Sequence, residues 1–172
     1  VHGIVKSMGG NITVTSDVGR GTTVSILIPV VSPGTLSAEK NSGGEIPGGS
    51  GRILVVDDES QVVKATSAIL DELGYSAETW TDSILALKRF REDPRAYDLV
   101  ILDHMMPQMT GIELAAAIKE ARSDIPVILY SGYTNQNIMG KSAEAGITAV
   151  LKKPARMEEL AAAVRGVLGV YK

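Results

Sequence analysis

The chain contains no cysteine, so it has neither a disulfide framework nor a metal site built from thiolates. Aromatic residues make up only 4% of its 172 residues, so a hydrophobic core must be built from Val, Ile, Leu, Ala and Met. No apolar run approaches the roughly 20 residues of a membrane-spanning helix, and no signal peptide is visible. The net charge of −3 is too small to indicate a surface for nucleic acid. The remaining composition, 44% hydrophobic and 22% charged residues, is typical of a globular protein.

Three zones of different composition follow one another along the chain. Residues 1–31 have a short helical pattern and then two alternating runs, 12–15 and 24–28, which predict a helix followed by a β-hairpin. Residues 32–50 are rich in Gly, Ser and Pro, and we expect a flexible linker with an r.m.s. span of roughly 24 Å. Residues 51–172 form the third zone. Because the first residue is Val rather than Met, we expect the sequence to be a piece of a longer chain.

Strand and helix patterns alternate strictly through the third zone. The predicted strands are 53–57, 76–79, 99–103, 127–131 and 149–152, and the predicted helices are 59–73, 82–92, 110–122, 135–145 and 155–168. Gly74 is a suitable stop for the first helix, and Pro154 a suitable start for the last. The first and third strands are continuous apolar runs, as expected for parallel strands that are covered on both faces. The pattern predicts an α/β fold with a doubly wound five-stranded parallel sheet.

Polar residues follow four of these strands. Asp57 and Asp58 end the first strand, Asp103 the third and Ser131 the fourth, and Lys153 follows the fifth. Ligands of an open parallel sheet bind beyond the carboxyl ends of its strands. With a strand order of 2-1-3-4-5, the first and third strands are neighbours, so their carboxylates would converge.

Converging carboxylates raise one another's pKa unless a cation lies among them, and Mg²⁺ with oxygen ligands is the common solution. We expect Asp58 and Asp103 to bind Mg²⁺ directly and Asp57 to act through water. Asp103 can then be the nucleophile that accepts a phosphoryl group. Lys153 can pair with one phosphoryl oxygen, and the Ser131 hydroxyl can bond another.

Each residue also has an ordinary structural explanation. Asp58 or Ser60 could cap the first helix, Asp103 could form a turn, Ser131 could be a loop residue, and Lys153 a surface lysine. A separate coincidence at each strand end is a poor explanation of the whole set.

With these residues in place, residues 52–170 resemble the receiver domains of two-component signalling. The matching segments are ILVVDDE, DLVILDHMMPQMTGIEL, PVILYSG and KKP, and the intervals between them also match. The resemblance implies a flavodoxin-like sheet of order 2-1-3-4-5, Asp103 as phosphoacceptor, and Ser131 as switch hydroxyl. Asp57 and Asp58 become the acidic pair, and Lys153, which precedes Pro154, the invariant lysine. It further implies that the backbone carbonyl of Met105 binds the metal and that the Lys153–Pro154 peptide bond is cis.

Two positions bear on signalling and on the lifetime of the phosphate. The family usually has Tyr or Phe three residues before the lysine, and here Val150 occupies that position, so the aromatic half of the usual switch is missing. Two side chains of the family border the path of the hydrolytic water, and these correspond to Met105 and Tyr133. Because neither is a carboxylate or an amide, we predict slow self-dephosphorylation.

Residues 1–31 resemble the end of the ATP-binding domain of sensor histidine kinases, through VHGIVKSMGGNITVTSDVGRGTTVSILIPV. The asparagine box, first glycine box, ATP lid and phospho-accepting histidine helix of those kinases are absent. We therefore expect the domains to be a kinase remnant at 1–31, a linker at 32–50 and a receiver at 51–172. This order indicates the C-terminal part of a hybrid histidine kinase.

The expected function is that of a phosphorelay receiver that takes a phosphoryl group from phosphohistidine and relays or slowly hydrolyses it. The alternative is a docking or regulatory receiver that modulates the parent kinase without onward transfer. A hydrolase of the haloacid dehalogenase kind would need Asp where Met105 stands. Whether the piece counts as an enzyme is left open, since we expect only self-phosphorylation and autodephosphorylation at Asp103. Expected partners are a phosphohistidine domain and, in a relay, a histidine phosphotransfer protein. We expect a cytoplasmic fragment without nucleic-acid or membrane contact, even if the parent chain is membrane-anchored.

Overall fold

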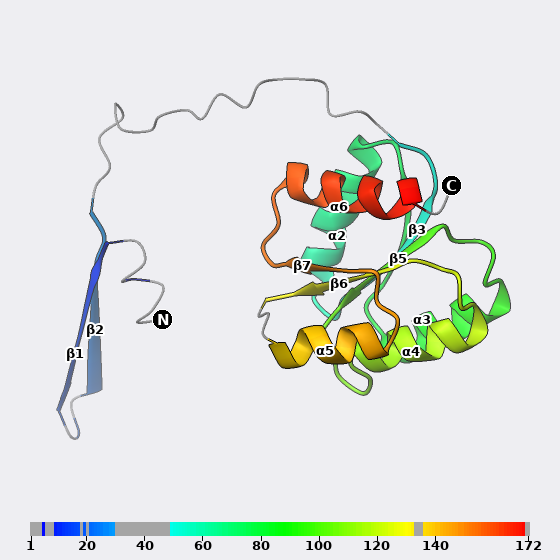
Figure 1. The fold of residues 1–172 in the computed structure, drawn as a ribbon. Coiled ribbons are helices and arrows are strands. Elements are labelled where there is room, and N and C mark those ends of the chain that lie inside the picture. Colours follow the sequence, from blue (N-terminus) through cyan, green and yellow to red (C-terminus); the bar gives the residue numbers. More distant parts are fainter. Residues whose placement is uncertain are drawn as a thin grey trace. The chain divides into compact units, whose positions relative to one another are not determined.

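The computed structural model describes residue 5 and residues 9–17, 19, 21–29, 49–132 and 136–170. The chain divides into two compact units, Val1–Gly44 and Glu45–Lys172 (Figure 1). Each unit is described by itself below. Within the described residues, no helix is long and apolar enough to cross a membrane.

The first unit contains an antiparallel hairpin of β1, Asn11–Asp17, and β2, Gly21–Leu27, which confirms the predicted hairpin. Cross-strand pairing joins Ile12 to Ile26 and Val14 to Val24, so one face of the hairpin is apolar. The opposite face carries mainly Thr and Ser. Most of the helix predicted before the hairpin lies outside the described residues.

The second unit is built on a five-stranded sheet in which all neighbouring strands are parallel. Its order, β4-β3-β5-β6-β7, is the predicted 2-1-3-4-5. The strands are β3 (Arg52–Val56), β4 (Ser76–Trp80), β5 (Leu99–Asp103), β6 (Val127–Ser131) and β7 (Ala149–Lys152). The predicted α/β doubly wound fold is confirmed.

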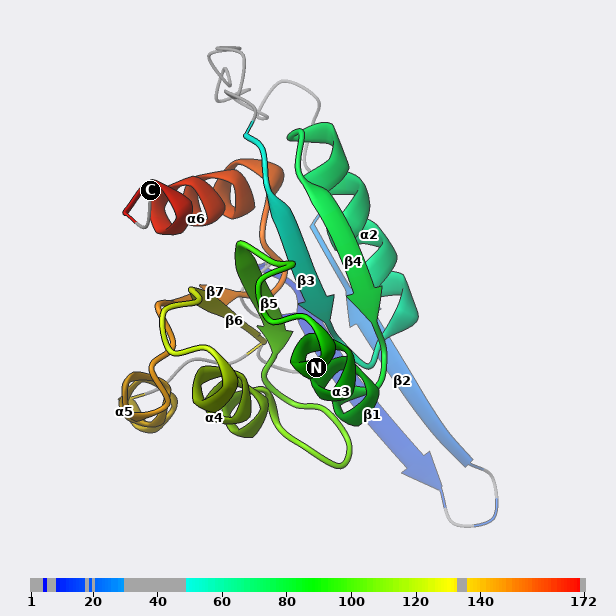
Figure 2. The ribbon, with the colours of Figure 1, turned by 90° about the vertical axis from the view of Figure 1, so that its right-hand side faces the viewer.

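Helices cover both faces of the sheet. They are α2 (Ser60–Glu72), α3 (Ser83–Glu92), α4 (Gly111–Ala121), α5 (Gln136–Glu144) and α6 (Met157–Val170). Figures 1 and 2 show α2 and α6 on one face and α3, α4 and α5 on the other. Gly74 ends the first of them with a positive φ of 85°, as predicted.

The last helix starts two residues later than the predicted start at residue 155. The helix begins at Met157, because the backbone before it is held by other partners. The Tyr130 hydroxyl accepts a hydrogen bond from the Ala155 amide at 2.9 Å, and the Glu159 carboxylate accepts one from the Arg156 amide at 2.9 Å. Pro154 therefore lies in the loop and not in the first turn.

Alternation along the central strands divides the core into two layers. On β3, Leu54 packs with α3 and α4, whereas Ile53 packs with α2 and α6. All four apolar residues of β3 are buried. On β5, Val100 and Leu102 join the first layer, and Leu99 joins the second. Burial on both faces is the reason why these strands are uninterrupted apolar runs.

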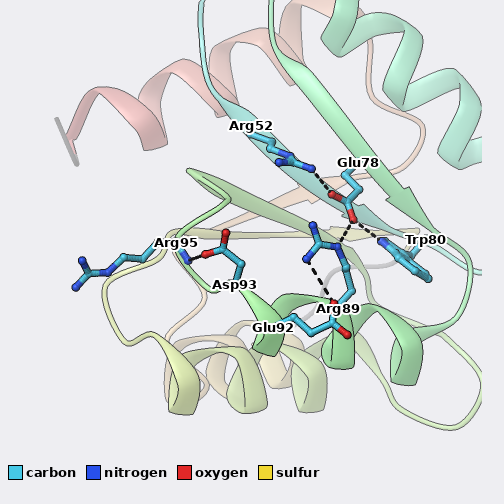
Figure 3. Close-up of polar contacts among 7 residues, drawn as sticks. All are labelled: Arg52, Glu78, Trp80, Arg89, Glu92, Asp93 and Arg95. Carbon is cyan, nitrogen blue, oxygen red and sulfur yellow. Dashed lines mark hydrogen bonds and ion pairs between the residues drawn. The ribbon is translucent and has the colours of Figure 1, made fainter.

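The edge strand β4 carries an inward-pointing charge, Glu78 (Figure 3). Its carboxylate accepts hydrogen bonds from Arg52 Nη2 at 2.6 Å, Arg89 Nε at 3.1 Å and Trp80 Nε1 at 3.1 Å. Burial alone would raise the pKa of Glu78, but these donors and the nearby Tyr97 outweigh it and lower the pKa. A charge that points inward on an edge strand discourages pairing with a further strand.

Candidate active site

The carboxyl ends of four parallel strands place the predicted polar residues at one edge of the sheet. Asp57 directly follows β3, Asp103 ends β5, Ser131 ends β6 and Lys153 directly follows β7. Backbone hydrogen bonds connect these ends, since the Lys153 amide donates to the Ser131 carbonyl at 2.8 Å. The convergence predicted from strand order is therefore found.

A single ammonium group joins the two buried carboxylates. Lys153 Nζ lies 2.5 Å from Asp57 Oδ2 and 2.5 Å from Asp103 Oδ1. The side chains of Asp57 and Asp103 are only 3% and 8% exposed, so water screens these ion pairs poorly. Lys153 and Asp57 are 96 positions apart in the chain, so this ion pair is a tertiary contact.

The remaining carboxylate oxygens are held by backbone amides. Asp103 Oδ2 accepts from the Met105 amide at 2.6 Å, and Asp57 Oδ1 accepts from the Glu59 amide at 3.0 Å. Gly111, the first residue of α4, packs against the Asp103 backbone so closely that a Cβ atom there would lie 2.0 Å from the Asp103 carbonyl oxygen. Both carboxylates are thus fixed in orientation before any ligand arrives.

Electrostatics show a shortage of positive charge at this edge. Burial raises the pKa of Asp57, and the Asp103 carboxylate adds to the increase, although hydrogen bonds from Lys153 and the Glu59 amide oppose it. Burial would lower the pKa of Lys153, but its hydrogen bonds to Asp103 and Asp57 outweigh burial and raise it. One ammonium between two carboxylates leaves an excess negative charge.

A cavity of about 520 Å³ opens at this edge. Its lining residues come from the ends of β3, β5, β6 and β7 and from α5: Asp58, Glu59, Asp103, His104, Met105, Ser131, Gly132, Ile138 and Lys153. The cavity therefore brings Asp58, Ser131 and Met105 together with the Asp103–Lys153 pair. The Met105 side chain is 71% exposed.

Several sequence-based expectations can be compared with this geometry. The Lys153–Pro154 bond is cis, as expected. Glu59, and not Asp58 or Ser60, is the N-cap residue of α2, and no side-chain hydrogen bond caps this helix, so the capping explanation of Asp58 fails. Val150 is half-buried and packs against the core beneath α3 and α4. Tyr133 lies outside the described residues.

Sequence reasoning missed two residues of this region. His104 lines the cavity, and its Nδ1 atom lies 3.4 Å from Ser131 Oγ. Tyr130 places its ring 5.2 Å from Lys153 Nζ. Both residues lie within segments that resemble the receiver family, directly beside Asp103 and Ser131, and these positions were the available signal.

The donors at this edge fit a hard divalent cation. They are carboxylate oxygens, which Mg²⁺ prefers, and the ion would compensate the excess negative charge. In the described part of the chain, no group of three or more His, Asp or Glu side chains is close enough to hold a metal ion without other ligands. Mg²⁺ in such sites commonly keeps several waters and binds only one or two carboxylates, which agrees with this arrangement.

The chain belongs to the response regulator receiver domain family, whose sequence profile matches residues 53–165. Fold neighbours agree with this assignment. The Vibrio cholerae chemotaxis protein CheY4 superposes with a TM-score of 0.65 and 27% identity over 69% of this chain and 99% of that one. The beryllofluoride-activated DrrB receiver domain gives a TM-score of 0.61 and 31% identity over 70% of this chain and 99% of that one.

Relatives that match nearly the whole chain are sensor kinases. The aerobic respiration control sensor protein ArcB of Escherichia coli (strain K12) is 30% identical over 167 residues, which cover 94% of this chain and 21% of that protein. The sensor kinase CckA of Brucella abortus (strain 2308) is 29% identical over 176 residues, covering 98% of this chain and 19% of that protein. The chain thus spans about a fifth of these relatives, consistent with a receiver domain of a hybrid kinase.

Proposed function

We propose that this receiver accepts a phosphoryl group on Asp103 from a phosphohistidine, with the help of Mg²⁺. The observation that carries the proposal is the Lys153 ammonium, 2.5 Å from both Asp57 and Asp103 at the wall of an open cavity. The arrangement offers a nucleophile, a positive charge beside it and room for a phosphoryl group.

In the proposed reaction, a carboxylate oxygen of Asp103 attacks phosphorus. The new oxygen–phosphorus bond forms as the phosphorus–nitrogen bond of the donor breaks, and the donor imidazole keeps the electron pair. The Lys153 ammonium pairs with a phosphoryl oxygen, and the Ser131 hydroxyl donates to another. Asp57, Asp58, Asp103 and the Met105 carbonyl would hold Mg²⁺, either directly or through water. When bound, the ion neutralises charge on the phosphoryl oxygens.

The proposed parent protein is a hybrid sensor histidine kinase that acts in a phosphorelay. The match of ArcB and CckA along nearly the whole chain supports this proposal. The partners would be a phosphohistidine domain and a histidine phosphotransfer protein, and the receiver would act in the cytoplasm. The alternative, a receiver that regulates its kinase without onward transfer, uses the same site and differs only in whether the phosphate leaves for another histidine.

The hairpin is proposed to be the end of the kinase's ATP-binding domain. Its Val14, Val24 and Ile26 side chains are 63%, 53% and 46% exposed, as expected for a sheet face that packs against the rest of such a domain. Because residues 1–31 lack the other nucleotide-binding motifs, we expect no ATP binding by the 172-residue chain. Micromolar affinity in a calorimetric titration with ATP would contradict this assignment.

Acetyl phosphate with Mg²⁺ tests the proposed function directly. We expect one labelled residue, Asp103 by mass spectrometry, and no labelling after Asp103→Asn. The control is Asp124→Asn, which removes a 72% exposed carboxylate that precedes β6 at the opposite edge of the sheet. Labelling that survives Asp103→Asn at a comparable rate, or that never occurs in the unsubstituted chain, would refute the proposal.

A further inference from the structure

Tyr130 connects β6 with the loop that carries Lys153. Its hydroxyl accepts a hydrogen bond from the Ala155 amide at 2.9 Å, two residues after the lysine. Its ring lies under the Lys153 ammonium, with 5.2 Å between Nζ and the ring centroid. One side chain therefore contacts both the charged end of Lys153 and the backbone that follows it.

Strand alternation explains this placement. Ser131 faces the cavity, so the preceding residue, Tyr130, faces the opposite side of the sheet, where it packs against the core layer of α2 and α6. The ring is half-buried there and anchored by this packing. β7, Ala149–Lys152, contains no aromatic residue, so this strand offers no ring to the lysine.

Lysine has a flexible four-carbon side chain, and fixing its ammonium in one place costs conformational entropy. The ion pairs with Asp57 and Asp103 fix it only while those carboxylates are free. During phosphoryl transfer Asp103 becomes an acyl phosphate, so it no longer presents a carboxylate anion to the Lys153 ammonium. The contacts with Tyr130 involve neither carboxylate, so the reaction leaves them unchanged.

We propose that Tyr130 is a positioning residue for phosphoryl transfer: its ring holds the Lys153 ammonium, and its hydroxyl holds the backbone beyond it. The inference rests on the proposed function of Asp103 and Lys153. Tyr130 itself touches no reacting atom. It acts by keeping the positive charge where the transferring phosphoryl oxygens need it.

The test uses two substitutions in the full chain, with acetyl phosphate as the donor. Tyr130→Phe keeps the ring and removes the hydroxyl, and we expect labelling of Asp103 to slow about threefold. Tyr130→Leu removes both contacts, and we expect it to slow about tenfold. The matched control is Tyr75→Leu, the same change in the same core layer but before β4, at the other edge of the sheet. It should leave the labelling rate of the folded protein unchanged.

A second measurement separates positioning from a general distortion of the site. Trp80 is the only tryptophan, and its carbonyl accepts the Asp57 amide at 3.1 Å, so its fluorescence can follow Mg²⁺ binding. Because Tyr130 contacts the lysine and not the acidic residues, Mg²⁺ affinity should change less than twofold in both variants. If Tyr130→Leu does not fold, Tyr130→Phe carries the test alone.

Labelling rates equal to those of the unsubstituted chain would overturn the inference. A slower rate accompanied by an equal loss of Mg²⁺ affinity would also overturn it, because the site would then be distorted as a whole. Absence of labelling in the unsubstituted chain would instead refute the proposed function, so the two failures can be distinguished.

Discussion

Glu78→Gln should destabilise the receiver by about 1 to 2 kcal/mol at neutral pH. The carboxylate accepts from Arg52, Arg89 and Trp80, and its side chain is only 21% exposed. Each half-exposed ion pair contributes roughly 0.2 to 1 kcal/mol, and the hydrogen bond from Trp80 about 1 kcal/mol. Gln keeps one acceptor oxygen, so part of this network survives. Its NH₂ group is a hydrogen-bond donor, however, and cannot accept a hydrogen bond from the arginine side chains.

The effect should depend on pH in a defined direction. The pKa of Glu78 in the folded chain lies below the ordinary value of 4.5, so the folded state holds its proton less tightly than the unfolded state. The stabilisation is therefore fully present above the unfolded pKa and is lost as the pH falls from about 5 through the folded pKa. The stability difference between the two proteins should be largest at pH 7 and should shrink on acidification.

Urea denaturation at a series of pH values measures both quantities. Glu92→Gln is the matched control, because Glu92 is 58% exposed and, among the described residues, its one ion pair is with Arg89 at 3.7 Å. We expect that change to alter stability by less than about 0.5 kcal/mol. A Glu78→Gln protein as stable as its parent at pH 7, or a difference that grows as the pH falls, would refute the reasoning.

Three further outcomes are expected. Met105→Asn should speed the loss of phosphate from Asp103 roughly tenfold after the donor is removed, which corresponds to about 1.4 kcal/mol of activation barrier. The reason is that the Asn amide can orient a water molecule, whereas the apolar Met105 side chain shields the phosphoryl group from water. Decay within seconds in the parent protein would contradict this prediction. Beryllofluoride binding should shift NMR signals mainly in α5 and in the loop before it, because Val150 has no aromatic ring that could move. Shifts of equal size in β7 and α6 would contradict this prediction. Gly111→Ala should cost about 2 kcal/mol in urea denaturation, because its Cβ would meet the Asp103 carbonyl, whereas Gly140→Ala, with open space around it, should not destabilise.

Local patterns were enough to predict the fold class. Uninterrupted apolar runs in β3 and β5 predict strands that are covered on both faces, and helical stripes between them predict the parallel βα order. Each strand of the sheet was expected within one residue of its bounds. The four polar positions at the strand ends were predictable for the same reason, because parallel strands end at a common edge.

Other features were decided by the tertiary structure alone. Residue order cannot show that Lys153 lies between Asp57 and Asp103, because this depends on the path of the loop after β7 and on the rotamer of a long side chain. The same loop delays the start of α6 to Met157, since Tyr130 holds the Ala155 amide from another strand. Periodicity reports which face of an element is buried. It does not report which side chains contact one another there, because such contacts join segments that are far apart in the chain. The contact of Tyr130 with Lys153 is one example.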